Sequence, residues 1–150
     1  MITFQHEKLD GFVQEAKDLF KKHYDEIAEG KDVIKLDPDL DRYAKLEKKG
    51  KLEVHTIRKD GVLIGYSLWL LNYHLHYKTS FMASSDILYI SPDHRKGMVG
   101  VKFIKWTTEE IKKRNPVKIV FHVKPFMDYG NILERQGAHF FEKLYSIVLE

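Results

Sequence analysis

Hydrophobic positions along the chain change their spacing several times, and each spacing predicts one kind of element. Between residues 9 and 27 the apolar side chains recur three and four positions apart, which is typical of an amphipathic helix. Residues 39–50 repeat this spacing over a shorter stretch, so a second helix is expected there. The first helix is predicted to end at Gly30, and a short strand is predicted before it because Ile2 and Phe4 alternate with polar residues.

The middle of the chain carries the patterns of strands. Residues 52–57 alternate between apolar and polar side chains, and Asp60-Gly61 follows them. Asp-Gly between two extended runs favours a tight hairpin turn, because glycine adopts a positive φ without steric cost. The return strand, residues 62–71, is apolar on both faces, as expected for a central strand that helices cover on both sides.

The rest of the chain alternates between strand and helix patterns. A polar, aromatic-rich connection over residues 72–79 is expected to lead to a third long strand at 81–90, and helical spacing returns over 98–114. The pattern then predicts a strand at 117–123, a short helix at 128–136 and a final strand at 140–149. This order, β-α-α-β-β-β-α-β-α-β, predicts an α/β fold with a central mixed sheet flanked by helices.

The composition describes one folded domain over residues 1–150. A chain of 150 residues with 43% hydrophobic and 13% aromatic content is long enough for one core, and no repeat or linker divides it. It contains no cysteine, which excludes disulfides, thiolate metal sites and cysteine nucleophiles. No apolar run approaches about 20 residues and residues 1–7 lack the order of a signal peptide, so we expect a cytoplasmic protein without a membrane span.

The charge balance narrows the class of ligand. The net charge is +3, from 25 basic and 22 acidic residues. So small an excess permits an anionic ligand, but the lysines are spread over helix faces and balanced by acids, which predicts only weak, salt-sensitive contact with nucleic acid. No specific nucleic-acid partner is expected.

The most informative segment runs from Ile87 to Val101, where an apolar strand ends at a proline and a basic turn opens a helix. Unpaired N–H groups in a first helical turn point outward, and the helix dipole favours negative charge there. Arg95 and Lys96 add positive charge, and the glycines let a ligand approach the backbone. The segment predicts a pyrophosphate site, although it matches neither a Walker loop nor a Gly-x-Gly-x-x-Gly fingerprint. The alternative is a strand-to-helix turn with a solvated Arg-Lys pair.

The segment from Ser91 onward resembles the acetyl-CoA-binding motif of the GNAT superfamily of N-acetyltransferases. That motif reads Arg/Gln-x-x-Gly-x-Gly/Ala, and here Arg95 takes its first position and Gly100 its last. Met98 stands at the middle glycine position, with Gly97 one residue earlier. The resemblance extends over nearly the whole chain, because the predicted order of elements is that of the family.

The resemblance implies acetyl-CoA as cosubstrate, with no metal. Pantetheine would lie between two splayed parallel strands, where backbone amides of the first strand bind it and polarise the thioester carbonyl. The family's asparagine after the fifth strand is missing at its expected place, where Phe126 stands, and Asn131 lies displaced from it. The residues implied to bind the cofactor are Leu88, Tyr89, Ile90, Arg95, Lys96, Gly97, Met98, Val99, Gly100, Val101 and Asn131.

The resemblance also implies three catalytic candidates. An amine with a pKa near ~10.4 is mostly protonated at pH 7, so a base is expected, and Asp86 stands close to where relatives place a carboxylate. The alternative for Asp86 is a solvated aspartate or one that pairs in a hairpin. His74 borders the loop that is expected to contact the acceptor. The His74-x-His76 pair lacks a nearby third ligand, so a metal site is not expected there. The alternative is a pair of surface histidines without a role. Leu133 replaces the tyrosine that protonates the leaving thiolate, and Tyr129, one turn earlier, is the candidate substitute unless it only packs in the core.

The leading functional prediction is direct transfer of acetyl from acetyl-CoA to a primary amine in a ternary complex. The acceptor would be an amine-bearing small molecule or a protein. The alternative is a catalytically weak or inactive GNAT-like domain that binds acyl-CoA or a protein partner, which the residues at 98 and 133 favour. No membrane partner is expected, and the chain is predicted to be a monomer or a homodimer paired through its final strand.

Overall fold

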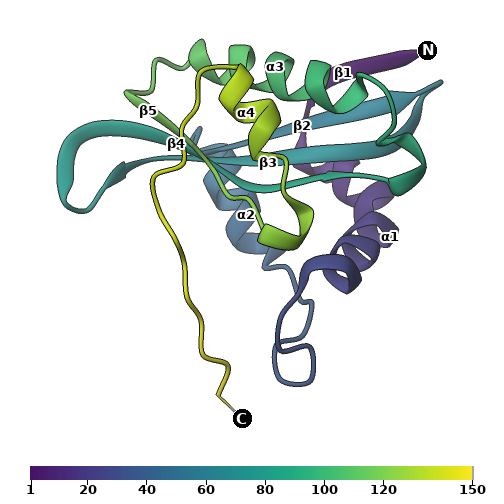
Figure 1. Cartoon of the computed structure of the whole chain (residues 1–150), viewed down its shortest axis with the longest axis horizontal. Coiled ribbons are helices and arrows are strands. Elements are labelled where there is room, and N and C mark those ends of the chain that lie inside the picture. Colours follow the sequence, from purple (N-terminus) through teal and green to yellow (C-terminus); the bar gives the residue numbers. More distant parts are fainter. Residues whose placement is uncertain (150) are drawn as a thin grey trace.

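A computed structural model describes residues 1–149 and shows a five-stranded sheet in the order β1-β2-β3-β4-β5 (Figure 1). Neighbouring strands are antiparallel except β4 and β5, which are parallel, so the mixed sheet expected from the sequence is confirmed. The strands are β1 (Ile2–Glu7), β2 (Leu52–Lys59), β3 (Val62–His74), β4 (Tyr77–Ile90) and β5 (Lys118–Phe121).

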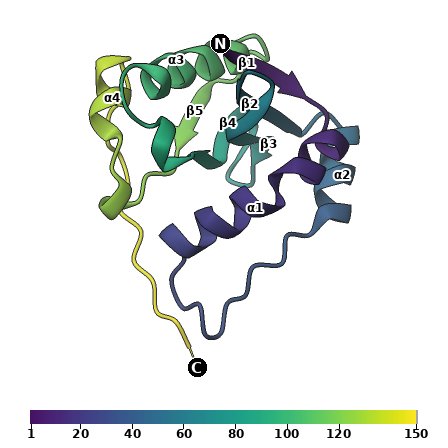
Figure 2. The same ribbon diagram turned by 90° about the vertical axis from the view of Figure 1, so that its right-hand side faces the viewer.

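Helices cover both faces of the sheet. Figure 2 shows α1 and α3 on opposite sides of it, with α2 beside α1 and α4 beside α3. None of the helices within residues 1–149 is both long and apolar enough to cross a bilayer. The helical elements are α1 (Leu9–Ile27), α2 (Leu40–Lys48), α3 (Val99–Lys112), α4 (Gly130–Arg135) and the single turns η1 (Pro92–His94) and η2 (Pro125–Met127).

The central strand β3 forms core on both of its faces, as its apolar sequence predicts. Tyr66 and Leu68 pack in the cluster that contains the apolar side of α1, whereas Trp69 and Leu71 pack in the cluster that contains Ile111 of α3. These side chains are at most 1% exposed. Burying such side chains on both faces stabilises the layered arrangement and fixes the two helices relative to the sheet.

The turn between β2 and β3 has the geometry expected of Asp-Gly. Asp60 has a φ of 50° and Gly61 a φ of 83°, so both central residues adopt the left-handed conformation that this kind of hairpin turn requires. The two strands run directly into the turn, with Lys59 opposite Val62. The predicted hairpin is confirmed.

The connection expected over residues 72–79 is wrong, because β3 and β4 continue almost to their turn. β3 extends to His74 and β4 begins at Tyr77. Aromatic rings pair across the two strands, with centroids 5.4 Å apart for Tyr73 and Phe81 and 5.0 Å apart for His74 and Tyr77. Such cross-strand pairs stabilise an antiparallel ladder, so the polar and aromatic composition here belongs to an exposed hairpin.

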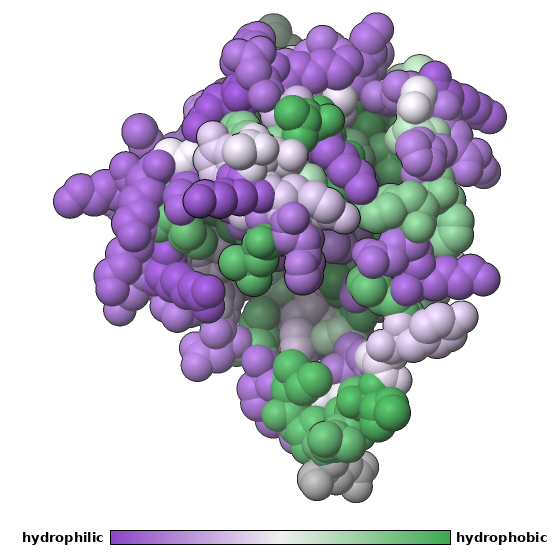
Figure 3. Space-filling view, turned by 90° about the vertical axis from the view of Figure 1, so that its left-hand side faces the viewer, coloured by the Kyte–Doolittle hydropathy of each residue, from purple (hydrophilic) through white to green (hydrophobic). Residues whose placement is uncertain are grey.

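The final strand expected at residues 140–149 is also wrong. This segment has no strand pairing, and β5 remains the edge of the sheet (Figure 1). The segment instead contacts the end of α1 and the turn that follows: Ser146 Oγ donates to Glu29 at 2.6 Å, and a Cβ at Gly30 would lie 2.7 Å from Val148. Hydrophobic residues gather at this end of the molecule (Figure 3). Phe141 still meets β5, with Lys118 Nζ 3.9 Å from the centroid of its ring, but the segment forms no ladder there and continues toward the end of α1.

Candidate functional site

Strands β4 and β5 separate after a short parallel pairing. They pair from Met82 opposite Lys118 to Ser85 opposite Phe121, and no pairing continues beyond that point. The last five residues of β4, 86–90, therefore face a gap on the β5 side. The gap lies at the carboxyl ends of two neighbouring parallel strands, a common position for ligand sites in open sheets. It matches the splay that the family resemblance implies.

A bulge in β4 sets the direction of Asp86. Ser85 lies opposite Trp69 and Ile87 opposite Leu68, so Asp86 is the extra residue without a partner on β3. An extra residue shifts the alternation of side chains, which re-aims those that follow it. As a result Asp86 reaches Tyr43 on α2 and Ile87 packs against the α1 cluster, on the same side of the sheet.

A cavity of about 550 Å³ occupies the gap between the two strands. Its walls come from the end of α1, the last residues of β4, the beginning of α3 and the chain that follows β5. The lining residues are His23, Ile27, Asp86, Ile87, Leu88, Tyr89, Ile90, Arg95, Gly100, Ile104, His122, Lys124, Met127, Asp128, Tyr129 and Ile132.

The carboxylate of Asp86 has one hydrogen-bond donor at the cavity wall. The Tyr43 hydroxyl donates to Asp86 Oδ2 at 2.9 Å. Burial and the neighbouring carboxylate raise the pKa of Tyr43, so its phenol stays protonated and keeps donating. The sequence placed Tyr43 only on the buried side of a helix, because nothing local relates it to a strand 43 residues away.

A second phenol lines the other side of the cavity. Tyr129 is the residue before α4 rather than part of that helix, and its hydroxyl donates to the His122 carbonyl at 3.2 Å. Burial raises the pKa of Tyr129 to about 12, so at neutral pH it carries its proton. His122 also lines the cavity, with Nε2 2.9 Å from the Ser84 hydroxyl. No pattern in the sequence indicated a role for His122.

Arg95 lines the cavity while it is held by an acidic partner. Its Nη1 and Nη2 lie 2.5 and 2.8 Å from the two carboxylate oxygens of Glu26, and its Nε donates to the Ile90 carbonyl at 2.7 Å. The hydrogen bonds to Glu26 raise the pKa of Arg95, and the same bonds lower the pKa of Glu26. Arg95 therefore joins the end of β4 to the last turns of α1.

The amino end of α3 opens at the cavity without a side-chain cap. Gly97 has a φ of 74°, and Met98, the N-cap residue, makes no capping hydrogen bond. Gly100 lines the cavity, and a Cβ built there would lie 3.6 Å from Ile90 Cδ1. The uncapped N–H groups of this 14-residue helix and the exposed Lys96 just before it provide an environment that favours an anion.

His23 lines the cavity with an uncharged ring, and no sequence pattern indicated this position. Its Nδ1 lies 3.1 Å from the Tyr66 hydroxyl, and its ring stacks on Tyr89 with centroids 4.8 Å apart. Burial lowers the pKa of His23 to about 4, so the ring is uncharged at neutral pH. Tyr89 adds a buried hydroxyl that has no hydrogen-bond partner within the described part of the chain.

Two candidates from the sequence do not reach the cavity. His74 lies at the tip of the β3–β4 hairpin, where its Nδ1 accepts from the His76 amide, and β4 runs about 30 Å from there to Asp86 at ~3.3 Å per residue. Asn131 is exposed on α4, whereas its neighbour Ile132 lines the cavity. The structure thus brings Asp86 and Tyr129 to one cavity and leaves His74 and Asn131 outside it.

No protein-family model matches the sequence, and no curated protein matches it by sequence. Solved structures resemble it over nearly its whole length. A GCN5-related N-acetyltransferase from Ralstonia eutropha JMP134 has a TM-score of 0.76 at 12% identity and covers 99% of both chains. A predicted acetyltransferase from Clostridium acetobutylicum, solved with acetyl-CoA, has a TM-score of 0.74 at 14% identity over 99% of this chain and 96% of its own.

Glucosamine-6-phosphate N-acetyltransferase from Arabidopsis thaliana has a TM-score of 0.73 at 10% identity, over 100% of this chain and 99% of its own. Likeness at such low identity is a likeness of fold. It agrees with the element order, the splayed β4–β5 pair and the glycine turn before α3. This chain has the fold of the GCN5-related N-acetyltransferases, the GNAT superfamily.

Proposed function

We propose that this protein is an N-acetyltransferase that transfers acetyl from acetyl-CoA directly to the primary amine of a small molecule or a protein. The observation that carries the proposal is the cavity between β4 and β5, which joins free strand backbone to the uncapped amino end of α3. An extended strand can bind a pantetheine arm, and the amino end of a helix can bind a pyrophosphate. A cavity that contains both suits a ligand that has both groups.

Acetyl-CoA is proposed to bind along this path. The N–H groups of Val99, Gly100 and Val101 would receive the pyrophosphate, together with the nearby positive charge of Lys96. The arm would lie against residues 86–90 of β4, which have no strand partner on that side. A backbone N–H there would stabilise the oxyanion that forms when an amine attacks the thioester carbonyl.

Asp86 is proposed to remove the proton from the acceptor amine. Its bulge aims it to the α1–α2 side of the sheet, and Tyr43 occupies only one carboxylate oxygen, which leaves the other free to accept. The neutral amine then attacks the carbonyl carbon and forms the C–N bond, its nitrogen releases its second proton to solvent, and the C–S bond breaks as the tetrahedral intermediate collapses. Tyr129 is proposed to give its proton to the departing thiolate, since its raised pKa keeps it protonated, and to recover a proton from solvent.

The activity can be tested by following thiol release from acetyl-CoA with a panel of primary amines, and by identifying the acetylated amine by mass spectrometry. We expect thiol release that requires an amine and produces one acetylated amine for each thiol. The panel should include a polyamine, an aminoglycoside, an amino sugar and a lysine peptide. Thiol release at the same rate without any amine would contradict transfer.

A binding-only domain is the second candidate, favoured by the ion pair of Arg95 with Glu26 and by the apolar Leu133 at the place of the family's tyrosine. Saturable binding of acetyl-CoA in calorimetry, without thiol release on any amine of the panel, would favour this candidate over the enzyme.

A further inference from the structure

Two histidines and a glutamate converge on β1 and β2, on residues that do not line the cavity. His6 of β1 lies opposite His55 of β2 in the strand register, and their rings are 5.3 Å apart between centroids. Glu53 precedes His55 by two residues and so shares its face of the strand. Each side chain offers one ligand atom, and these atoms lie within 4.8 Å of one another.

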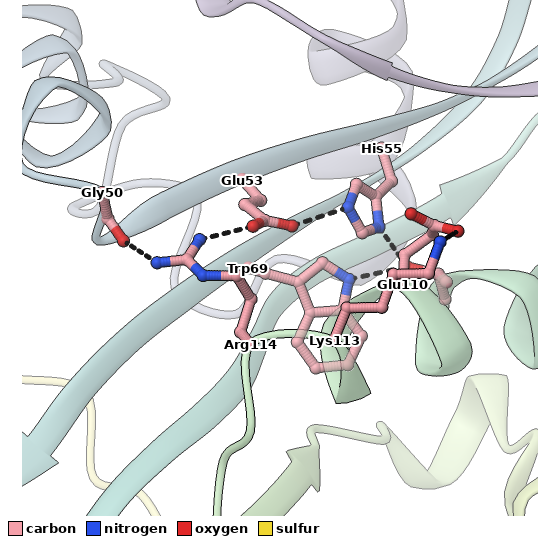
Figure 4. A network of polar contacts seen from close by, with 8 residues as sticks. Gly50, Glu53, His55, Trp69, Glu110, Lys113 and Arg114 are labelled. Carbon is pink, nitrogen blue, oxygen red and sulfur yellow. Dashed lines mark hydrogen bonds and ion pairs between the residues drawn. The ribbon is translucent and has the colours of Figure 1, made fainter.

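Buried partners hold two of these side chains in place (Figure 4). His55 is fully buried, with Nε2 3.0 Å from Glu53 Oε2 and Nδ1 2.6 Å from the Thr107 hydroxyl. Arg114 Nη1 lies 2.5 Å from Glu53 Oε1, the other carboxylate oxygen. The Trp69 indole donates to the same Thr107 hydroxyl at 2.8 Å. These contacts therefore fix the positions of both side chains.

We propose that His6, Glu53 and His55 form a binding site for a divalent transition metal ion of the zinc class, with a ring nitrogen of His6, Oε2 of Glu53 and Nε2 of His55 as ligands and a water at the fourth position. Two imidazoles and one carboxylate are a donor set that tetrahedral zinc takes where it keeps an open position. No local motif indicates this site, because His6 stands 47 residues before Glu53 in the chain.

The distances suit such an ion. With metal–ligand bonds of ~2.0–2.1 Å, two ligands of a tetrahedral ion lie about 3.3 Å apart. Glu53 Oε2 and His55 Nε2 are 3.0 Å apart, so this pair needs to open by only a few tenths of an ångström. His6 is exposed and makes no side-chain hydrogen bond among the described residues, so its ring is free to turn toward the pair and leaves the fourth position open to water.

The neighbours of the cluster match those that usually orient metal ligands. A ligating histidine commonly donates its second N–H to an oxygen, and His55 Nδ1 has the Thr107 hydroxyl in that place. That hydroxyl has two lone pairs, so it accepts from Trp69 and from His55 together. Arg114 orients the Glu53 carboxylate, although its positive charge also opposes a cation and moderates the affinity.

The site can be tested with the full chain by titrating Zn²⁺ in a calorimeter and by recording the visible spectrum with Co²⁺. We expect one Zn²⁺ per chain and the intense visible bands of tetrahedral Co²⁺. His6→Ala should weaken Zn²⁺ binding at least about 10-fold and remove the Co²⁺ bands. His6 is the residue of choice because its side chain is exposed, and Glu53→Gln, which keeps the shape of the side chain, is the second variant.

His74→Ala is the matched control, since His74 is exposed and lies beside another histidine at the hairpin tip. We expect it to bind Zn²⁺ as the parent chain does. The proposal is overturned if the parent chain shows no saturable binding up to about 1 mM Zn²⁺, or if His6→Ala binds with unchanged affinity. Loss of binding in His74→Ala with full binding in His6→Ala would assign the ion to the hairpin and equally overturn it. None of these readouts depends on acetyl transfer.

Discussion

Asp86 projects from the bulge in β4. Replacing it tests whether it removes the proton from the amine without contributing to cofactor binding. Asp86→Asn keeps the shape and still accepts the hydrogen bond from Tyr43, but an amide is not a base. We expect kcat to fall by about 100-fold or more, with the dissociation constant for acetyl-CoA nearly unchanged. Steady-state kinetics and calorimetry measure the two quantities.

Tyr43→Phe is the control for Asp86, because it removes the hydrogen bond while the carboxylate stays. A smaller loss of kcat is expected in that variant. If Asp86→Asn weakens acetyl-CoA binding as much as it slows turnover, Asp86 is not a catalytic base.

The ion pair of Arg95 with Glu26 is predicted to contribute to the free energy of unfolding. Its two side chains are 31% and 25% exposed, so each replacement leaves a partly buried charge without its partner. We expect Arg95→Ala and Glu26→Ala each to lower the free energy of unfolding by about 1–2 kcal/mol. The double variant should lose less than the sum of the two. Urea denaturation of all four proteins gives the coupling energy, and additive losses would show that the pair contributes nothing.

The placement of site residues was predictable from the sequence where one local motif indicated it. The resemblance to the acetyl-CoA-binding motif singles out Arg95 and Gly100, and both line the cavity wall, while their roles stay predictions. The acidic partner of Arg95 was not predictable, since Glu26 lies 69 residues away and only the folded sheet brings α1 to the end of β4. The same reason hid Tyr43 beside Asp86.

At the scale of elements, α3 provides the sharpest test of the anion site. Gly100→Pro removes one uncapped N–H from the first turn, where proline is tolerated, and adds a ring beside Ile90. We expect acetyl-CoA binding to weaken at least about 10-fold, the loss of one charge-assisted hydrogen bond. Gly100→Ala keeps the N–H, and its Cβ would make an ordinary contact of 3.6 Å with Ile90 Cδ1.

Calorimetry on the two variants therefore isolates one backbone donor. Gly100→Ala should bind acetyl-CoA nearly as the parent chain does. If both variants bind acetyl-CoA with equal affinity, the amino end of α3 is not part of the acetyl-CoA site.

Helices and strands were predictable where the hydrophobic pattern and the local turn residues indicated the same element. They were not predictable where strand pairing with a distant segment determined the structure. The helical spacing over residues 9–27 was sufficient to predict α1, and the Asp-Gly pair after β2 was sufficient to predict the hairpin turn. Both signals depend only on neighbouring residues in the chain. The apolar run at 140–149 resembles a strand, yet a strand exists only with a paired neighbour. This segment touches β5 only through Phe141 and Lys118, forms no ladder with it, and contacts Glu29 and Gly30 farther along. The bulge at Asp86 is also invisible in the sequence, since it depends on the register with β3.

At the scale of the whole molecule, the two proposed sites use different edges of one sheet. The cavity lies where β4 and β5 separate, and the His6, Glu53 and His55 cluster lies on β1 and β2. α3 contributes to both, with its amino end at the cavity and Thr107 beneath the cluster. The buried central strand, β3, lies between them, so a change at one site is expected to leave ligand binding at the other unaffected.

The stability of the molecule should depend on pH through His23. Its pKa is about 4 in the folded chain against 6.5 for an exposed histidine, because the folded chain buries the ring. Between these values the unfolded chain binds the proton more readily, so stability is greatest above pH 6.5 and declines as the pH falls toward 4. From pH 7 to pH 5 the contribution lost is about 2 kcal/mol.

Chemical denaturation at the two pH values measures this loss. His23→Asn keeps an acceptor for the Tyr66 hydroxyl but does not titrate, so we expect its stability to fall less between pH 7 and pH 5. His6, whose pKa is also lowered, accounts for part of the decline that remains. His74→Asn, at an exposed position, should follow the parent chain. If the parent chain and His23→Asn lose equal stability over this range, the buried histidine is not what links folding to protons.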